Sequence, residues 1–292
     1  MITTKNSGIN EVTILSVQEN VCLKRTDIVS TEEPLEIRLY YFDSGQVLQS
    51  KNISVTMRTP GHDKDLALGF LFTEGIISGL DELDTIEHSM TNCTQSKQNT
   101  IQVTLKADAQ PLLYHAERNF YTSSSCGVCG KGSIAAIKTI SQFANTSKPS
   151  LSIEPSLFYS LPNQLRKAQD NFEQSGGIHA AGLFSAQGDL LFLREDVGRH
   201  NALDKLIGVA LNSDLLPLKK NILLLSGRAS FELIQKAAMA GIAVVAAIGA
   251  PSSLAVELAK ESDITLIGFL KQNRFNIYHL SKNITIPLEH EN

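Results

Sequence analysis

The sequence predicts an α/β protein with a smaller N-terminal α+β domain and a larger C-terminal α/β domain. Strand-like alternation and one helical pattern fill the first third of the chain, whereas short apolar runs alternate with helical patterns in the last third. A stretch rich in serine and glycine lies between them. Because 292 residues suffice for two cores, we expect one domain at 1–120, a mobile loop at 121–133 and a second domain at 134–292.

The first domain begins with about thirty mixed, polar residues. Period-two alternation then predicts strands at 35–41 and 53–57, joined as a hairpin or meander by a turn at 43–45. A further strand is predicted at 100–106. Together these strands indicate a small sheet with one buried face.

A helix is predicted between these strands, because the apolar period changes to about 3.6 from Asp63 onward and Gly75 supplies a stop. Asp63 and Asp65 are placed to cap its first turn. Gly69 would allow close packing in its interior. This segment therefore reads chiefly as structural.

The middle of the chain predicts two helices separated by a connection. A helix is expected at about 134–143, followed by a Pro/Ser-rich connection at 148–162 and a second helix near 164–174. The connection is interpreted as irregular because proline and serine favour turns.

The last third predicts a largely parallel sheet. Near-continuous apolar runs at 222–225, 243–248 and 264–269 are typical of strands buried on both faces. Helical patterns at 231–240 and 253–260 lie between them. Strand–helix alternation at this spacing implies right-handed crossovers and a sheet with helices on both sides.

Composition excludes several classes of protein. A formal net charge of -4 lacks the electrostatic footprint of a general nucleic-acid binder or of a protein drawn to anionic lipid. The start has no apolar signal core, and the longest apolar run, 242–248, is too short to cross a bilayer. Four cysteines are too few for a disulfide framework in a chain this long. We expect a cytoplasmic protein with reduced thiols.

The pair Cys126 and Cys129, in Ser-Cys-Gly-Val-Cys-Gly-Lys-Gly-Ser, is the sharpest chemical feature of the sequence. Gly127, Gly130 and neighbouring glycines leave the backbone free to swing, and Lys131 would lower a thiol pKa. A mobile thiolate that visits two sites is what a carrier requires.

Two other interpretations of the CxxC pair stay open. A structural zinc site would need two more ligands, for which Cys93 and His115 are candidates, although no second CxxC or HxxxH stands nearby. A thioredoxin-like redox pair would be expected at a helix start just after a strand, whereas this pair lies in a glycine-rich loop.

Polar clusters in the second half predict a ligand site at the carboxyl ends of the sheet strands. Ser226, Gly227 and Arg228 follow the first buried strand and precede a helix, where open α/β sheets bind ligands and where helix-start amides suit a phosphate. The other candidates are a histidine between small residues and two polar clusters: His179, then Asp196, Arg199 and His200, and finally Lys271, Gln272, Asn273 and Arg274. Two alternatives stay open, because His179 fits a satisfied core histidine equally well and the last cluster also fits a plain surface turn.

Read in order, these segments resemble the FdhD family, the formate dehydrogenase accessory sulfur carriers. The resemblance runs from about Glu33 to Tyr278. It rests on RTPG with LALGFL and EGI, SCGVCGKGSI, GGIHAAGLF, EDVGRHNALDKLIG, SGRASFELIQKAA with AGI, and APSSLAVELA followed by GF and RFNIY.

The resemblance implies a sulfurtransferase that takes sulfur from a cysteine desulfurase as a persulfide on Cys126, with Cys129 as partner thiol. The acceptor would be the molybdenum cofactor, bis(molybdopterin guanine dinucleotide), before or during its insertion into apo formate dehydrogenase. The cofactor-contacting stretch matches Phe269, Leu270, Lys271, Gln272, Asn273 and Arg274.

The resemblance further implies a three-layer α/β/α C-terminal domain similar to cytidine deaminases, and a homodimer. No permanently bound metal is expected. A working deaminase is disfavoured, because no HxE segment precedes a PCxxC. Two alternatives in function remain: a molybdenum cofactor chaperone or scaffold that transfers no sulfur, and a CxxC disulfide reductase.

Overall fold

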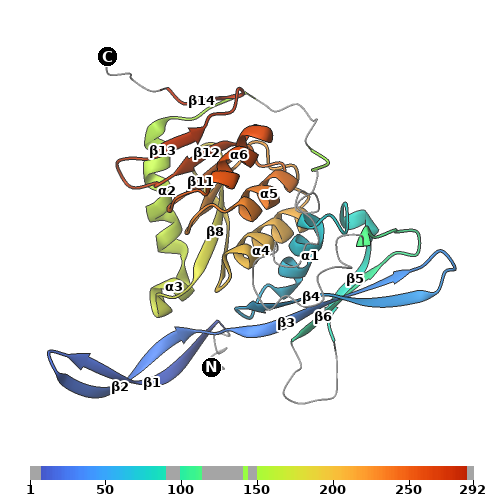
Figure 1. Cartoon of the computed structure of the whole chain (residues 1–292), viewed down its shortest axis with the longest axis horizontal. Coiled ribbons are helices and arrows are strands. Elements are labelled where there is room, and N and C mark those ends of the chain that lie inside the picture. The colour runs from blue at the N-terminus through green and yellow to red at the C-terminus, as the bar shows by residue number, and fades with distance from the viewer. Residues whose placement is uncertain (1–7, 90–98, 114–140, 144–149, 288–292) are drawn as a thin grey trace.

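The computed structural model describes residues 8–89, 99–113, 141–143 and 150–287, and the fold is a mixed α/β arrangement built on two main sheets (Figure 1). The loop at 121–133, with Cys126 and Cys129, lies outside the described residues, as does Cys93. No helix among the described residues is long and apolar enough to cross a membrane. The division expected from the sequence, with domains at 1–120 and 134–292 and a loop at 121–133, remains a prediction.

The N-terminal part contains a hairpin and a four-stranded sheet. The hairpin joins β1 (Ile9–Gln18) to β2 (Val21–Ser30). The sheet has the order β4-β3-β6-β5, with β3 at Glu33–Phe42, β4 at Leu48–Arg58, β5 at Leu83–His88 and β6 at Thr100–Leu105. Helix α1 (Asp63–Thr73) follows β4, and a short 3₁₀ turn (Leu80–Glu82) precedes β5. The strands predicted at 35–41, 53–57 and 100–106 are confirmed.

The C-terminal part is a six-stranded sheet with the order β13-β12-β11-β10-β8-β9. Its strands are β8 (His179–Phe184), β9 (Leu190–Asp196), β10 (Ile222–Leu225), β11 (Val244–Ala247), β12 (Thr265–Gly268) and β13 (Asn276–His279). The helices are α2 (Pro155–Ala168), α3 (Asp170–Ser175), α4 (Arg199–Asn212), α5 (Phe231–Met239) and α6 (Ser253–Glu261). Two-residue strands β7 (Leu151–Ser152) and β14 (Ile284–Thr285) pair separately.

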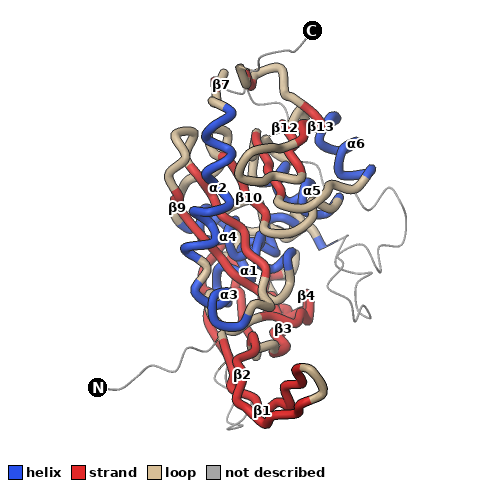
Figure 2. Tube along the Cα trace, turned by 90° about the vertical axis from the view of Figure 1, so that its left-hand side faces the viewer, coloured by secondary structure: helices blue, strands red, loops and turns tan. Residues whose placement is uncertain are grey.

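Alternate residues along the strands of the six-stranded sheet point to opposite faces and pack in two different hydrophobic cores. On one face, Phe184 and Leu224 pack with α2, including Phe158. On the other face, Leu183 and Leu223 join a larger core with α4, α5 and α6. That larger core continues without a break into α1 and the inner face of the four-stranded sheet. Figure 2 shows the four-stranded sheet and the hairpin at one end and the six-stranded sheet at the other.

Helices α1 and α4 cross at two glycines. A Cβ on Gly69 would stand 1.9 Å from the backbone oxygen of Asp204, and one on Gly208 would stand 1.9 Å from that of Asp65. Only residues without a side chain let two helix backbones approach this closely. The prediction that Gly69 allows close packing is confirmed, and its partner is Gly208.

Two predictions for the segment before the six-stranded sheet were wrong in detail. The segment at 148–162 is not all irregular, because α2 begins at Pro155 and contains Pro162. The helix placed near 164–174 is instead the end of α2 and the separate α3, which meet at Gln169. Proline fits the first turn of a helix, where its missing N–H is not needed, and apolar burial holds the rest of α2 on the sheet.

The sheet is also less parallel than predicted. Among the described strands of this sheet, β10 pairs with β11 and β11 with β12 in parallel. The other three pairs, β8 with β10, β8 with β9 and β12 with β13, are antiparallel. Strand β8 escaped prediction because its histidine, glycine and alanines lack the β-branched signal of a strand. The β1–β2 hairpin likewise arises from the mixed, polar N-terminal residues. Of the helix predicted at 134–143, only 141–143 are described, and 142–143 form a turn.

Candidate functional site

The carboxyl ends of β10, β11 and β12 form a continuous rim at one edge of the six-stranded sheet. The backbone N–H of Gly249, after β11, donates to Gly227 O at 2.9 Å, and the N–H of Phe269, after β12, donates to Gly249 O at 3.0 Å. These bonds join the three loops that follow the three strands. Open α/β sheets bind ligands at this edge.

Antiparallel pairing brings the other predicted polar residues to the same rim. Strand β8 runs against β10, so its first residue, His179, lies at the carboxyl end of β10. Strand β9 runs against β8 and ends with Asp196 opposite His179, directly before α4 and its first residues Arg199 and His200. Residues from five separate segments therefore share one edge.

The segment after β10 is anchored by its first serine. The Ser226 hydroxyl accepts the N–H of Ala180 at 2.8 Å, and the Ser226 N–H donates to Ala180 O at 3.0 Å. A Cβ on Gly227 would stand 3.4 Å from His179 Nδ1, so backbone and imidazole lie close together. Helix α5 then begins after Ser230, whose side chain makes no capping hydrogen bond.

The stretch after β12 divides into one core residue and an exposed loop. Leu270 is 1% exposed and packs in the core, so its side chain cannot reach a ligand on the rim. Phe269 has a φ of 52° and an exposed ring. Lys271 N–H donates to Arg274 O at 2.9 Å, which closes the loop, and the side chains of Lys271, Gln272, Asn273 and Arg274 are exposed.

The rim carries cations that the described part of the chain does not neutralise. Arg228 and Arg274 are exposed and form no ion pair with any residue that the structure describes. Arg199 is half-buried, and its Nε has no hydrogen-bond partner among the described residues. Guanidinium groups without carboxylate partners suit an anionic ligand.

Two histidines at the rim have different surroundings. Burial, and secondarily the charge of Arg199, lowers the pKa of His179, which favours the neutral ring. His200 is buried, with Nε2 3.4 Å from Ser230 Oγ and 3.8 Å from a Glu232 carboxylate oxygen. The hydrogen bond with His200 lowers the pKa of Glu232 from 4.5 to about 2. Glu232 thus links the starts of α4 and α5.

Replacing Glu232 with glutamine is expected to remove a pH-dependent part of the stability. The folded-state pKa of Glu232 lies below its ordinary value, so this contribution is fully present above about pH 4.5 and is lost as the pH falls through about 2. The difference in Tm between wild type and Glu232→Gln should therefore be largest at neutral pH and shrink toward about pH 3. Glu257→Gln, at an exposed position on α6, is the control. A difference that stays constant with pH would contradict this assignment.

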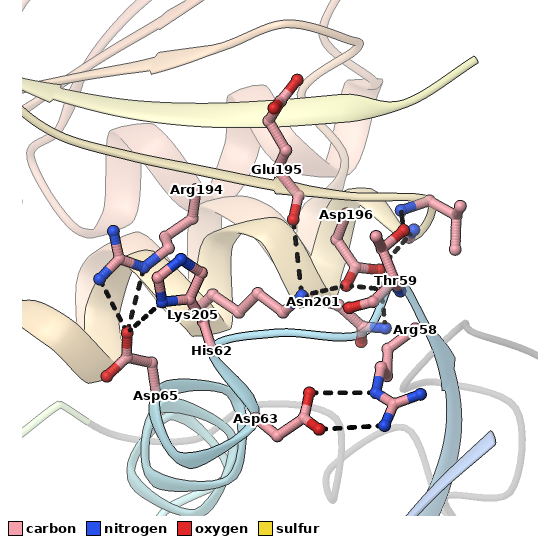
Figure 3. Close-up of polar contacts among 12 residues, drawn as sticks. Arg58, Thr59, His62, Asp63, Asp65, Arg194, Glu195, Asp196, Asn201 and Lys205 are labelled. Carbon is pink, nitrogen blue, oxygen red and sulfur yellow. Dashed lines mark hydrogen bonds and ion pairs between the residues drawn. The ribbon is translucent and has the colours of Figure 1, made fainter. Parts of the chain in front are cut away.

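A buried ion pair holds Thr59, in the segment after β4, against the end of β9 and helix α4 (Figure 3). Lys205 Nζ lies 2.7 Å from an Asp196 carboxylate oxygen, and both side chains are almost fully buried. Lys205 also donates to Thr59 O at 2.7 Å, while the Thr59 N–H donates to Asp196 at 3.1 Å. Asn201 donates to both Asp196 and Met57 O. Burial raises the pKa of Asp196 despite the opposing charge of Lys205.

Further pairs hold the same segment from its other side. The Arg58 guanidinium, which is fully buried, donates two bonds of 3.0 Å to Asp63 and one of 3.2 Å to Glu33. Arg194 pairs with Asp65 at 2.8 Å (Figure 3). The prediction that Asp63 and Asp65 cap α1 was wrong, because no side chain caps this helix and both carboxylates bind arginines instead. His62, the N-cap residue, is largely exposed and has a φ of 56°.

A third buried pair joins α4 to α5 and α1. Lys236 Nζ lies 3.0 Å from Asp204 and 3.2 Å from Glu74, and it contacts Thr73 Oγ1 at 2.9 Å. Burial opposes the charge of Lys236, but the two carboxylates outweigh it and raise the pKa. A buried cation with two carboxylates and a hydroxyl is fully satisfied. This group is structural.

The match to a protein family model covers residues 31–285 and identifies the FdhD/NarQ family. The chain belongs to this family. It is 47% identical over 268 residues to the sulfur carrier protein FdhD of Streptomyces avermitilis, covering 91% of this chain and 92% of the relative. It is 38% identical over 271 residues to the protein of the same name from Saccharolobus solfataricus, covering 93% and 96%. The predicted resemblance is thus confirmed.

The fold is also similar to a solved structure. A protein from Desulfotalea psychrophila, assigned as a formate dehydrogenase accessory protein, superposes with a TM-score of 0.68 at 22% identity, covering 94% of this chain and 99% of that one. At this identity the similarity concerns the fold. The cytidine deaminase-like layering of the second domain stays a prediction.

The predicted site residues of this FdhD/NarQ family member are thus brought together on one rim, except that Leu270 is a core residue and that Cys126 and Cys129 lie outside the described residues. Among the described residues, no group of three His, Cys, Asp or Glu side chains could hold a metal ion. The sequence patterns did not indicate a role for Glu232 or the burial of Lys205. A charged residue inside an apolar helical run, as in ALDKLIG, was the available signal.

Proposed function

We propose that this protein is a sulfur carrier in the maturation of formate dehydrogenase. The observation that carries the proposal is family membership over residues 31–285, with relatives named sulfur carrier protein FdhD that align over more than 90% of their length. The chain also carries the thiol pair that such chemistry needs, Cys126 and Cys129.

In the proposed reaction, the Cys126 thiolate attacks the terminal sulfur of a persulfide on a cysteine desulfurase. The desulfurase thiolate leaves, and Cys126 becomes the persulfide. The Cys129 thiolate then attacks the inner sulfur, so that a Cys126–Cys129 disulfide forms and sulfide departs to the molybdenum of bis(molybdopterin guanine dinucleotide). A cellular thiol reductant restores the pair. Each step exchanges one S–S bond for another or releases sulfide, which balances atoms and electrons.

The rim supplies what an anionic cofactor substrate would need. Arg228 and Arg274 would pair with its pyrophosphates, and the uncapped start of α5 would add backbone amides. His179, Arg199 and His200 would shape the pocket beside them. Phe269 presents an exposed ring on the same edge for a planar group. The acceptor apo-enzyme would dock over this edge.

The test is intact-protein and peptide mass spectrometry of the full chain after incubation with a cysteine desulfurase and cysteine. We expect the gain of one reductant-labile sulfur on the peptide that holds Cys126. Cys22, a free and exposed thiol, is an internal control that should stay unmodified. Cys126→Ala should abolish the gain and leave binding of a guanine nucleotide intact.

Other outcomes would overturn the proposal in defined ways. An unmodified Cys126 in a chain that still binds the molybdenum cofactor would favour a cofactor chaperone. Reduction of insulin disulfides without nucleotide binding would favour a disulfide reductase. Equal sulfur on Cys22 and Cys126 would indicate nonspecific thiol chemistry governed by exposure alone.

A further inference from the structure

Glu232 places a carboxylate at the start of α5, beside the rim residues that would bind an anionic ligand. It is the second residue of the helix, and its side chain is 19% exposed. One carboxylate oxygen lies 3.8 Å from Nε2 of His200, in the first turn of α4, so the charge stands between two helix starts. Helix starts carry partial positive charge and attract anions. A negative side chain at this place is unexpected in a site for an anionic ligand.

The surroundings of Glu232 differ from those of the structural carboxylates. The buried aspartates described above lie 2.7–3.0 Å from a lysine or arginine nitrogen. Among the described residues, Glu232 forms an ion-pair contact with His200 and none with a lysine or arginine. Its pKa of about 2 keeps the carboxyl ionised at neutral pH. The rim thus combines the cations Arg199 and Arg228 with one negative charge that persists at neutral pH.

We propose that Glu232 is a specificity-determining residue of the rim, which disfavours nucleotides that end in a free phosphate relative to pyrophosphates esterified at both ends. The inference rests on the proposed function, since it concerns the ligand of the same rim. Each phosphate of an internal pyrophosphate carries about one negative charge, whereas a terminal phosphate carries about 1.5 to 2 at pH 7. Repulsion by a fixed carboxylate therefore falls mainly on the terminal phosphate.

The repulsion is large enough to affect which ligand is bound. At an effective dielectric constant of about 20, a terminal phosphate about 6 Å from a carboxylate would bind roughly tenfold more weakly than a diester phosphate at the same place. Arg199 and Arg228 act in the opposite sense, because cations favour the more highly charged ligand. Selective sites commonly contain such a repulsive element against the wrong ligand. Glu232 would supply it here.

Calorimetric titration of the full-length chain with GDP and with GDP-mannose tests the inference. The two ligands share the guanosine diphosphate group, and only GDP ends in a free phosphate. Glu232→Gln should tighten GDP binding roughly tenfold and GDP-mannose binding less than about threefold. Glu232→Asp keeps the carboxylate and should return the ratio of the two Kd values to within about threefold of the wild type. Glu257→Gln, at an exposed position on α6, is the matched control for the loss of one charge.

The ratio of the two Kd values decides the outcome, because any general disturbance of the rim affects both ligands alike. A ratio in Glu232→Gln that shifts less than about threefold, or an equal shift in Glu257→Gln, would overturn the inference. Unchanged circular dichroism at the titration temperature shows that each variant is folded. A wild-type chain that binds neither ligand would overturn the rim as the ligand site and this inference with it. A chain that shows the Glu232-dependent ratio but loads no sulfur on Cys126 would contradict the proposed function alone.

Discussion

Gly208→Ala is expected to destabilise the protein by at least about 3 kcal/mol, even though alanine is the better helix former by about 1 kcal/mol. The new Cβ would stand 1.9 Å from the backbone oxygen of Asp65 and 2.6 Å from its carbonyl carbon. Backbone atoms cannot rotate away as a side chain does, so α1 and α4 would have to separate. That separation would disturb both Asp65 and its partner Arg194.

The measurement is thermal or urea unfolding followed by circular dichroism. For a chain of this size we expect Tm to fall by roughly 6–12 °C. Gly69→Ala should behave in the same way, because its Cβ would meet Asp204 at the same distance. Gly177→Ala is the control, since its Cβ would have only one neighbour, at 3.8 Å. If Gly208→Ala unfolds with the wild-type midpoint, the close helix crossing is wrong.

Lys205→Met is expected to reduce the free energy of unfolding by about 3–5 kcal/mol. Methionine has nearly the same volume, but it leaves the Asp196 carboxylate buried without its cation and Thr59 O without its donor. Burial already raises the pKa of Asp196 in the wild type, and loss of Lys205 raises it further. A carboxyl with a raised folded-state pKa contributes stability that is lost as the pH rises. The deficit should therefore be larger at pH ~8 than at pH ~5.

A double-mutant cycle separates the ion pair from general packing. Lys205→Met leaves the Asp196 carboxylate without its cation, and Asp196→Asn removes that carboxylate. The loss of unfolding free energy in the double variant should therefore be smaller than the sum of the two single losses, by roughly 0.5–3 kcal/mol. Chemical unfolding at two pH values gives all four corners of the cycle. Additive losses with no pH dependence would mean that Asp196 and Lys205 do not interact.

Particular segments show where sequence reasoning sufficed. Strands β10, β11 and β12 were predicted within one or two residues, because a continuous apolar run is required of a strand with a core on each face. The rim position of Ser226 to Arg228 followed from the strand–turn–helix pattern alone. In both cases the signal is local, since it depends on residues adjacent in the chain.

Other segments depended on distant partners. The β1–β2 segment is a hairpin although its residues are mixed, and α2 contains Pro162 although proline opposes helix interiors. Asp63 and Asp65 have the sequence pattern of helix caps, yet Arg58 and Arg194 bind them. Tertiary contacts outweighed local preference at each of these positions.

By itself, the sequence determined the family, the α/β class, the thiol pair at Cys126 and Cys129, and the polar segments that form the rim. These depend on residue identity and on short-range periodicity. Only the tertiary structure decided that His179 lies opposite Asp196, that Lys205 and Arg58 are buried with their carboxylates, and that Gly69 meets Gly208 across two helices. Those pairings join residues far apart in the chain, and they are selected by complementary charge and volume once the two sheets have packed on one core.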